Sequence, residues 1–145
     1  MISVLVIGCG SIGERHLRCF QSTGRAKVTA CDASPAILAN LAKTYQVATF
    51  NDWELALAQE KFDAVIICTP AHLHVPMAIR VLQKGCHVLI EKPLSISLAG
   101  VNDLLKARDL SGRQAVVGYT LHSSPLLIAA RDFLRAGALG AILHV

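Results

Sequence analysis

The sequence has few aromatic residues, few charged residues and no long apolar run. Aromatic residues make up 5% of its 145 residues and charged residues 17%, whereas hydrophobic residues reach 53%. This much apolar material supports a large core and excludes intrinsic disorder. The length allows one ordinary domain, since domains usually have about 100–200 residues. Because the apolar residues are mainly Val, Ile, Leu and Ala, we expect strands buried on both faces with helices packed over them.

No stretch of the sequence is suited to crossing a membrane. The uncharged and largely apolar stretch at residues 64–79 contains Pro70, Pro76 and two histidines. It is shorter than the ~20 continuous apolar residues that a spanning helix needs. The opening residues, MISVLVIGCG, lack the basic leader of a signal peptide. We therefore expect a cytoplasmic protein with no membrane partner.

Neither the charges nor the cysteines follow a binding pattern. The net charge is +4, but the 14 Lys and Arg residues form no basic run. Without a basic cluster interleaved with aromatic residues, we expect no nucleic-acid partner. The five cysteines are odd in number and form no CxxC pair. We interpret them as buried small hydrophobic residues in a reducing compartment, not as a disulfide framework.

Strand-like segments alternate with helix-like segments along most of the chain. Parallel strands joined by helices form a doubly wound sheet, because the right-handed crossover places helices on both faces. We therefore predict an α/β Rossmann domain over residues 1–119, with strand order 3-2-1-4-5-6. The expected strands are 1–7, 27–32, 47–50, 63–70, 86–93 and 114–119, and the main expected helices are 12–23, 34–45, 75–84 and 97–110.

The remaining residues, 120–145, do not fit the first sheet. They contain an amphipathic helical segment over 124–137 and an apolar segment, AILHV, over 141–145. A lone terminal strand exposes unpaired backbone groups. We therefore expect residues 120–145 to begin a second, C-terminal domain that the chain contains only in part, and the protein to be a homo-oligomer. The alternatives are that AILHV joins the first sheet or is frayed.

The first expected strand leads directly into a glycine-rich turn. Gly8, Gly10 and Gly13 fit the G-x-G-x-x-G pattern, between a strand and a helix. Gly8 permits the tight turn, Gly10 lets a pyrophosphate approach the backbone, and Gly13 lets the helix lie close to the strand. The helix N-terminus, at Ser11 and Ile12, offers free N–H groups and a positive dipole to phosphates. The alternative is an ordinary glycine-rich turn.

Asp32 ends the second expected strand, about 20 residues after the glycine turn. An acid at this place accepts hydrogen bonds from the ribose hydroxyls of an adenosine. It would also repel a 2′-phosphate, and neighbouring Ala33 and Ser34 carry no positive charge, so NAD is favoured over NADP. Two alternatives stay open: Asp32 caps the next helix, or the turn serves a methyltransferase that binds S-adenosylmethionine.

Later segments resemble one oxidoreductase family. These segments are CTPAHLH at 68–74, GCHVLIEKPL at 85–94, VGY at 117–119 and AGALG at 136–140. With the glycine turn, they resemble the Gfo/Idh/MocA oxidoreductases, the glucose–fructose oxidoreductase and inositol dehydrogenase family. The resemblance covers essentially the whole chain. It implies a dinucleotide-binding domain, a following α/β domain and a small-molecule substrate of the sugar or polyol class between them.

The resemblance also implies roles for residues after the fourth and fifth expected strands. Thr69 and Pro70 would line the cofactor groove opposite the glycine turn. His74 would lie near the cofactor, and Glu91 would contact the ribose on the nicotinamide side. The alternative for Glu91 is a loop-capping acid. All four residues are present in the segments that carry the resemblance.

Lys92 is the candidate catalytic residue, and Pro93 would fix its backbone through a cis peptide bond. By resemblance, Lys92 would point at the substrate oxygen beside the nicotinamide ring. Its chemistry also suits the task, since hydride loss from an alcohol carbon requires removal of the hydroxyl proton. An ammonium group beside that oxygen can stabilise negative charge or shuttle the proton. The alternative is a solvated surface lysine.

The sequence departs from the family pattern after the sixth expected strand. His122 and Ser123 stand where the family commonly has Arg-Phe, so substrate contacts are not assigned there. His72 and His74 lack Cys or acidic partners at ligand spacing, and we expect no metal site and a structural His72. The acid and histidine of the family's second domain would lie beyond Val145.

The leading hypothesis is an NAD-dependent oxidoreductase that transfers a hydride between nicotinamide and a sugar, polyol or related hydroxy or keto compound. The alternative is a dinucleotide-binding module without turnover. Because half of the active-site cleft is expected to lie outside it, the 145-residue chain should bind NAD weakly and have no activity by itself.

Overall fold

Six parallel strands form one sheet in the order β3-β2-β1-β4-β5-β6. This computed structural model describes residues 1–137 and 139–141. Each neighbouring pair of strands is parallel, so the predicted Rossmann topology is confirmed. The carboxyl ends of the strands therefore lie along one edge of the sheet. The strands are β1 (Ile2–Ile7), β2 (Ala26–Cys31), β3 (Ala48–Phe50), β4 (Ala64–Ile67), β5 (His87–Ile90) and β6 (Ala115–Val117).

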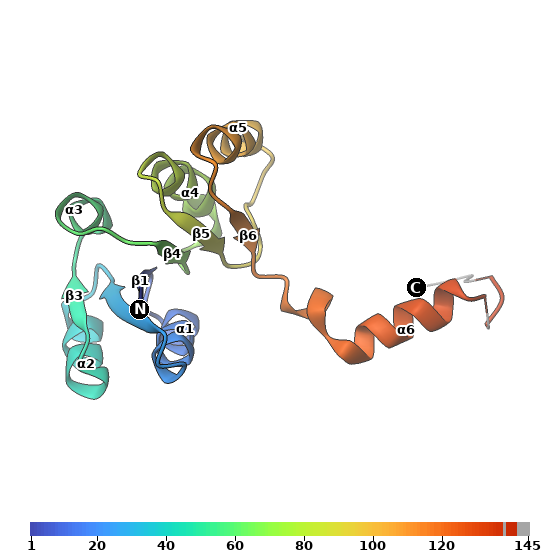
Figure 1. The fold of residues 1–145 in the computed structure, drawn as a ribbon, viewed down its shortest axis with the longest axis horizontal. Coiled ribbons are helices and arrows are strands. Elements are labelled where there is room, and N and C mark those ends of the chain that lie inside the picture. The colour runs from blue at the N-terminus through green and yellow to red at the C-terminus, as the bar shows by residue number, and fades with distance from the viewer. Residues whose placement is uncertain (138, 142–145) are drawn as a thin grey trace.

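Helices cover both faces of this sheet (Figure 1). On β1, Val6 belongs to the core on the side of Leu17 of α1, whereas Leu5 belongs to the core on the side of Val81 of α4. Successive side chains of a strand point to opposite faces, so β1 is buried on both sides, as its apolar composition predicted. The helices are α1 (Ser11–Ser22), α2 (Pro35–Tyr45), α3 (Trp53–Gln59), α4 (His74–Gln83) and α5 (Val101–Ser111).

Local signals in the sequence set several helix ends. Ser34 Oγ accepts a hydrogen bond from the N–H of Ile37 at 3.4 Å at the start of α2. Asp52 Oδ1 accepts one from Leu55 N at 3.1 Å at the start of α3. Such caps satisfy N–H groups that have no partner within the helix.

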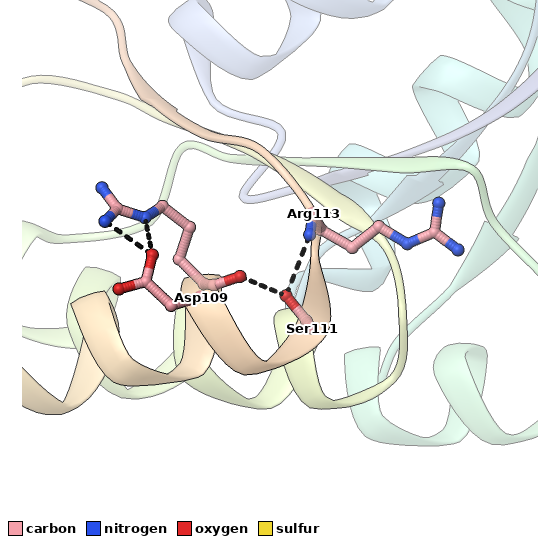
Figure 2. Close-up of polar contacts among 4 residues, drawn as sticks. Asp109, Ser111 and Arg113 are labelled. Carbon is pink, nitrogen blue, oxygen red and sulfur yellow. Dashed lines mark hydrogen bonds and ion pairs between the residues drawn. The ribbon is translucent and has the colours of Figure 1, made fainter.

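The end of α5 is closed by a short network of polar contacts (Figure 2). Ser111 Oγ donates to the carbonyl oxygen of Arg108 at 3.0 Å and accepts from the N–H of Arg113 at 3.2 Å. Gly112, between them, has a φ of 63°, a left-handed conformation that glycine adopts without strain. The network turns the chain from α5 into β6, at the edge of the sheet.

The start of α5 differs from the prediction. The helix begins at Val101 and not near Ser97. Gly100 has a φ of 75°, and a residue in this left-handed region cannot continue a right-handed helix. Leu98, which lies in the predicted helix range but before α5, is 88% exposed.

The segment after β6 extends away from the sheet (Figure 1). It contains a 3₁₀ turn, η2 (Thr120–Ser123), and α6 (Pro125–Arg135). No residue of α6 is buried, and its apolar side chains include Leu126 at 77% and Phe133 at 53% exposure. The strand expected over 141–145 lies outside the described residues apart from Ala141, which is irregular. Among the described helices, none has the length and apolar character needed to cross a membrane.

Candidate cofactor-binding site

Two glycines of the turn are required by close packing. Gly8 has a φ of 84°, and a Cβ on it would lie 2.8 Å from the carbonyl carbon of Cys68. A Cβ on Gly13 would lie 2.0 Å from the oxygen of Gly8. Real Cβ atoms do not approach other atoms so closely, so larger residues would push the turn away from β4 and α1. The steric roles predicted for Gly8 and Gly13 are confirmed.

Gly10 has a different environment, because it faces open space. Apart from its neighbours in the chain, no atom of the described residues lies within 4 Å of the position that a Cβ would take, and Gly10 lines a cavity at the carboxyl edge of the sheet. The helix α1 begins at the next residue, Ser11, and no side chain caps its first turn. Ser11 and Ile12 are exposed. This turn therefore leaves both room and backbone donors for a phosphate group.

Asp32 connects the end of β2 to the glycine turn. Its Oδ2 accepts a hydrogen bond from Cys9 N at 2.7 Å, and its Oδ1 accepts one from Ser34 N at 2.9 Å. The side chain that caps α2 belongs to Ser34, so the helix-capping alternative for Asp32 is wrong. Each carboxylate oxygen keeps a further lone pair with which to accept a ligand hydroxyl.

The cavity beside the turn has a volume of about 710 Å³. Ligand pockets usually enclose about 300–1,000 Å³, so the cavity is large enough for part of a dinucleotide. The rim carries Glu54 and Arg80, whose side chains lie 3.8 Å apart as an exposed ion pair. The lining includes Gly8, Gly10, Asp32, Thr69 and Pro70 among the predicted site residues, together with the apolar side chains of Ile37, Trp53, Leu73, Pro76 and Met77.

His74 lies behind the loop that follows β4, with 1% of its surface exposed. Its Nε2 lies 2.7 Å from the carbonyl oxygen of Thr69, and its Nδ1 lies 2.9 Å from that of Pro93. Because a carbonyl oxygen only accepts, each contact is a hydrogen bond when the ring nitrogen that makes it carries the proton. The imidazole thus joins the loop after β4 to the segment after β5.

Glu91 follows β5 and is held by two donors. Its Oε1 lies 2.7 Å from Nε2 of His16 on α1, and its Oε2 accepts from Lys92 N at 3.0 Å. Burial favours a higher pKa for Glu91, but the hydrogen bonds from His16 and Lys92 N outweigh it and lower the pKa. His16 was not among the predicted site residues. The available signal was its place three residues after Gly13, which sets both on one side of α1.

Lys92 is exposed at the carboxyl end of β5. Across the part of the chain that the structure describes, no hydrogen bond or ion pair holds its ammonium group, although its N–H is bonded to Glu91. The Lys92–Pro93 peptide bond is cis, as predicted. Lys92 can therefore reach a ligand at this edge without breaking an existing contact.

Other candidates lie outside this arrangement. His72 is exposed in the 3₁₀ turn η1 (Ala71–Leu73). Within residues 1–137 and 139–141, no group of three His, Cys, Asp or Glu side chains is placed to hold a metal ion.

Cys19 is exposed, so the burial expected for the cysteines does not hold for it. Burial raises the pKa of the Cys9, Cys31 and Cys68 thiols, which lie around the turn, to about 12.

Comparison with known proteins supports a nucleotide site here. Residues 2–119 match the Gfo/Idh/MocA family model, described as an oxidoreductase family with an NAD-binding Rossmann fold. Inositol 2-dehydrogenase of Rhizobium meliloti is 29% identical over 94% of the chain. The 2,7-anhydro-N-acetylneuraminate hydratase of Escherichia coli is 28% identical over 99% of it. The WlbA dehydrogenase of Bordetella pertussis, solved with NADH and UDP-GlcNAcA, superposes with a TM-score of 0.87 at 29% identity over 96% of the chain.

The chain spans only part of these proteins. It covers 42% of the inositol dehydrogenase, 38% of the hydratase and 43% of the WlbA chain. The family match confirms the predicted cofactor class, NAD, and favours it over S-adenosylmethionine. The glycine turn and the match over residues 2–119 together show that the chain belongs to the Gfo/Idh/MocA oxidoreductase family and contains its NAD-binding Rossmann fold.

Proposed function

We propose that this chain is the cofactor-binding part of an NAD-dependent dehydrogenase that interconverts a ring hydroxyl and a ketone on a sugar or polyol. The observation that carries the proposal is a row of groups along one edge of the sheet. The strand order β2-β1-β4-β5 places Asp32, the glycine turn, Thr69 and Lys92 in succession at the strand ends. Open α/β sheets bind their ligands at this edge.

The residues present fit a dinucleotide. The open space at Gly10 and the uncapped start of α1 suit the pyrophosphate. Asp32 lines the cavity and would accept hydrogen bonds from the adenosine ribose, and its charge disfavours the 2′-phosphate of NADP. The apolar cavity wall around Trp53 and Met77 suits an adenine ring. Thr69 and Pro70 would line the path towards the nicotinamide, and Glu91 would meet the second ribose.

Lys92 is the proposed catalytic residue. Bound NAD would supply the acceptor for the hydride. When the hydroxyl carbon loses a hydride, the oxygen must lose a proton, and the C–O bond becomes a carbonyl. As an ammonium, Lys92 would stabilise negative charge on this oxygen, and as a neutral amine it would accept the proton. Its exposed position supports this role, as does the lack of a hydrogen bond or ion pair to its ammonium group from any described residue.

The substrate class rests on the relatives. The relatives include inositol 2-dehydrogenase and a dTDP-sugar 3-reductase of Streptomyces violaceoruber, which is 32% identical over 94% of the chain. WlbA was solved with UDP-GlcNAcA. Each of these ligands or products is a ring carrying several hydroxyl or keto groups, and we assign this class to the present protein.

Residues 120–145 are proposed to begin a second domain that completes the substrate site. The exposed apolar face of α6, including Leu126 and Phe133, supports a partner surface there, either a further domain or a second subunit of a homo-oligomer. Because the chain covers about two fifths of its relatives, it should bind NAD but have no activity by itself.

A cytoplasmic location is proposed from the five cysteines, all free in the structure.

Titration with NADH and S-adenosylmethionine tests the cofactor assignment. We expect NADH to bind and S-adenosylmethionine not to bind. Tight binding of S-adenosylmethionine alone would overturn the proposal.

The catalytic assignment needs the longer protein, assayed for NADH formation with a panel of sugars and polyols. NADH binding without turnover of any of them would favour a dinucleotide-binding module, and turnover by the 145-residue chain would refute the need for a second domain.

A further inference from the structure

Two histidines hold the residues on either side of Lys92. His16, on α1, contacts the carboxylate of Glu91 at 2.7 Å. His74, at the start of α4, contacts the carbonyl oxygen of Pro93 at 2.9 Å. The two helices lie on opposite faces of the sheet (Figure 1). The Glu91–Pro93 segment is therefore fixed from both faces, while no hydrogen bond or ion pair from the described residues holds the Lys92 ammonium group.

The contact at Glu91 leaves this side chain little freedom. The carboxylate receives the N–H of Lys92 on its second oxygen at 3.0 Å. On another side, a Cβ at Gly118 would lie 3.4 Å from Oε1, so the end of β6 closes against it. The side chains of His16 and Glu91 are 22% and 16% exposed. A charge-assisted hydrogen bond in such a half-buried place is stronger than one in open solvent.

The contact at Pro93 reaches further into the fold. His74 is buried, and its other ring nitrogen contacts the Thr69 carbonyl at 2.7 Å. Thr69 lines the cavity proposed for the cofactor. His74 thus ties the backbone beside Lys92 to the backbone of the cavity wall, while His16 ties it to the helix that begins at the glycine turn.

From these contacts, and resting on the proposed function, we infer that His16 and His74 are positioning residues for Lys92. A lysine has four side-chain bonds that rotate, so the place of its ammonium depends on the backbone that carries it. A displacement of about 1 Å at a reacting group can lower a rate about 100-fold. The two histidines would hold the Lys92 backbone in a fixed position relative to the cofactor site, without touching substrate themselves.

Amide hydrogen exchange tests this inference without cofactor. The backbone N–H of Lys92 donates to the Glu91 carboxylate, so its exchange rate reports directly on the Glu91–Pro93 segment. We expect His16→Ala and His74→Gln each to raise the exchange rate of Lys92 about 10-fold, as expected for the loss of one hydrogen bond. His16→Gln keeps a side-chain donor and should restore the slow rate. Exchange at Leu5, in the centre of β1, serves as the control for global unfolding.

NADH titration followed by NMR supplies a second measurement. In the unaltered chain, we expect NADH to shift both the Gly10 amide and the Lys92 side-chain signals. In His16→Ala, the Gly10 response should persist while the Lys92 response falls by about half or more, and His16→Gln should restore it. Unchanged Lys92 exchange together with a full Lys92 response in both His16→Ala and His74→Gln would overturn the inference. If NADH does not shift the Gly10 amide signal of the unaltered chain, the proposed function is refuted instead. The amide hydrogen exchange of Lys92 would still test the positioning role.

Discussion

The carboxylate of Asp32 accepts a hydrogen bond from the backbone N–H of Cys9 at 2.7 Å. This bond fixes the end of β2 against the glycine turn, so one side chain both shapes the turn and faces the cavity. Nucleotide affinity and the geometry of the turn should therefore change together when Asp32 is replaced.

Replacement of Asp32 by Ala should weaken NADH binding by ~10–100-fold. The variant loses a charge-assisted hydrogen bond to the turn and the proposed acceptor for the ribose, and such bonds contribute about 1.5–3 kcal/mol each. Fluorescence titration with NADH measures the change. Asp109→Ala is the matched control, because Asp109 forms an exposed ion pair with Arg108 (Figure 2) and is not one of the residues that line the cavity. Equal affinities of the two variants would contradict the role of Asp32.

Two glycine substitutions should separate stability from binding. Gly13→Ala should destabilise the fold by about 1–3 kcal/mol or more, because its Cβ would lie 2.0 Å from the Gly8 oxygen. Gly10→Ala has open space and an ordinary φ of −63°, so thermal unfolding should change little. Both variants should lose NADH affinity, Gly10→Ala because its methyl group occupies the space for the phosphates. Unimpaired NADH binding by Gly10→Ala would be the contrary result.

Acid should release the contact between His16 and Glu91. The pKa of Glu91 is lowered in the folded protein, so its stabilising contribution is present above the ordinary carboxyl pKa of about 4.3 and is lost as the pH falls through the lowered value. Denaturant unfolding at several pH values should show this loss below about pH 4.3. Glu91→Gln removes the titrating group and should have a smaller dependence on pH. The same slope in both proteins would count against the contact.

Cys19 should react first with thiol reagents. It is exposed, whereas burial raises the pKa of the Cys31 and Cys68 thiols to about 12. At pH 8 only about one part in ten thousand of such a thiol is thiolate, the reactive form. Alkylation followed by peptide mass spectrometry should show one fast site, which Cys19→Ser removes. Equally fast labelling of Cys31 or Cys68 would show that the turn opens readily.

Removal of residues 120–145 should leave the Rossmann domain folded. No residue of α6 is buried, so the deletion exposes little apolar surface of the sheet and its helices. The thermal midpoint of residues 1–119 should match that of the whole chain, and any self-association in sedimentation should decrease. A large fall in the midpoint would mean that α6 packs on the domain in solution.

The sheet order and the glycine turn could be predicted because they depend on local patterns. Apolar β-branched segments mark buried parallel strands, and Gly8 and Gly13 stand where any side chain would collide with the backbone. The start of α5 could not be predicted from apolar spacing, because the left-handed conformation of Gly100 decided it.

Contacts between residues that are distant in the sequence could not be predicted either. His16 and Glu91 are 75 positions apart, and only the sheet order brings α1 and the end of β5 together. His74 could be placed in the site by its motif, but its two carbonyl partners depend on how the loops after β4 and β5 fold against each other.

A crystal structure of the chain with NADH tests the central claim most directly. We expect the pyrophosphate on the backbone of Gly10 and Ser11, the adenosine ribose at Asp32, and the nicotinamide ring within reach of the Lys92 ammonium. A dinucleotide bound with its nicotinamide end at the α2 side of the sheet, or outside the cavity beside the turn, would contradict the account.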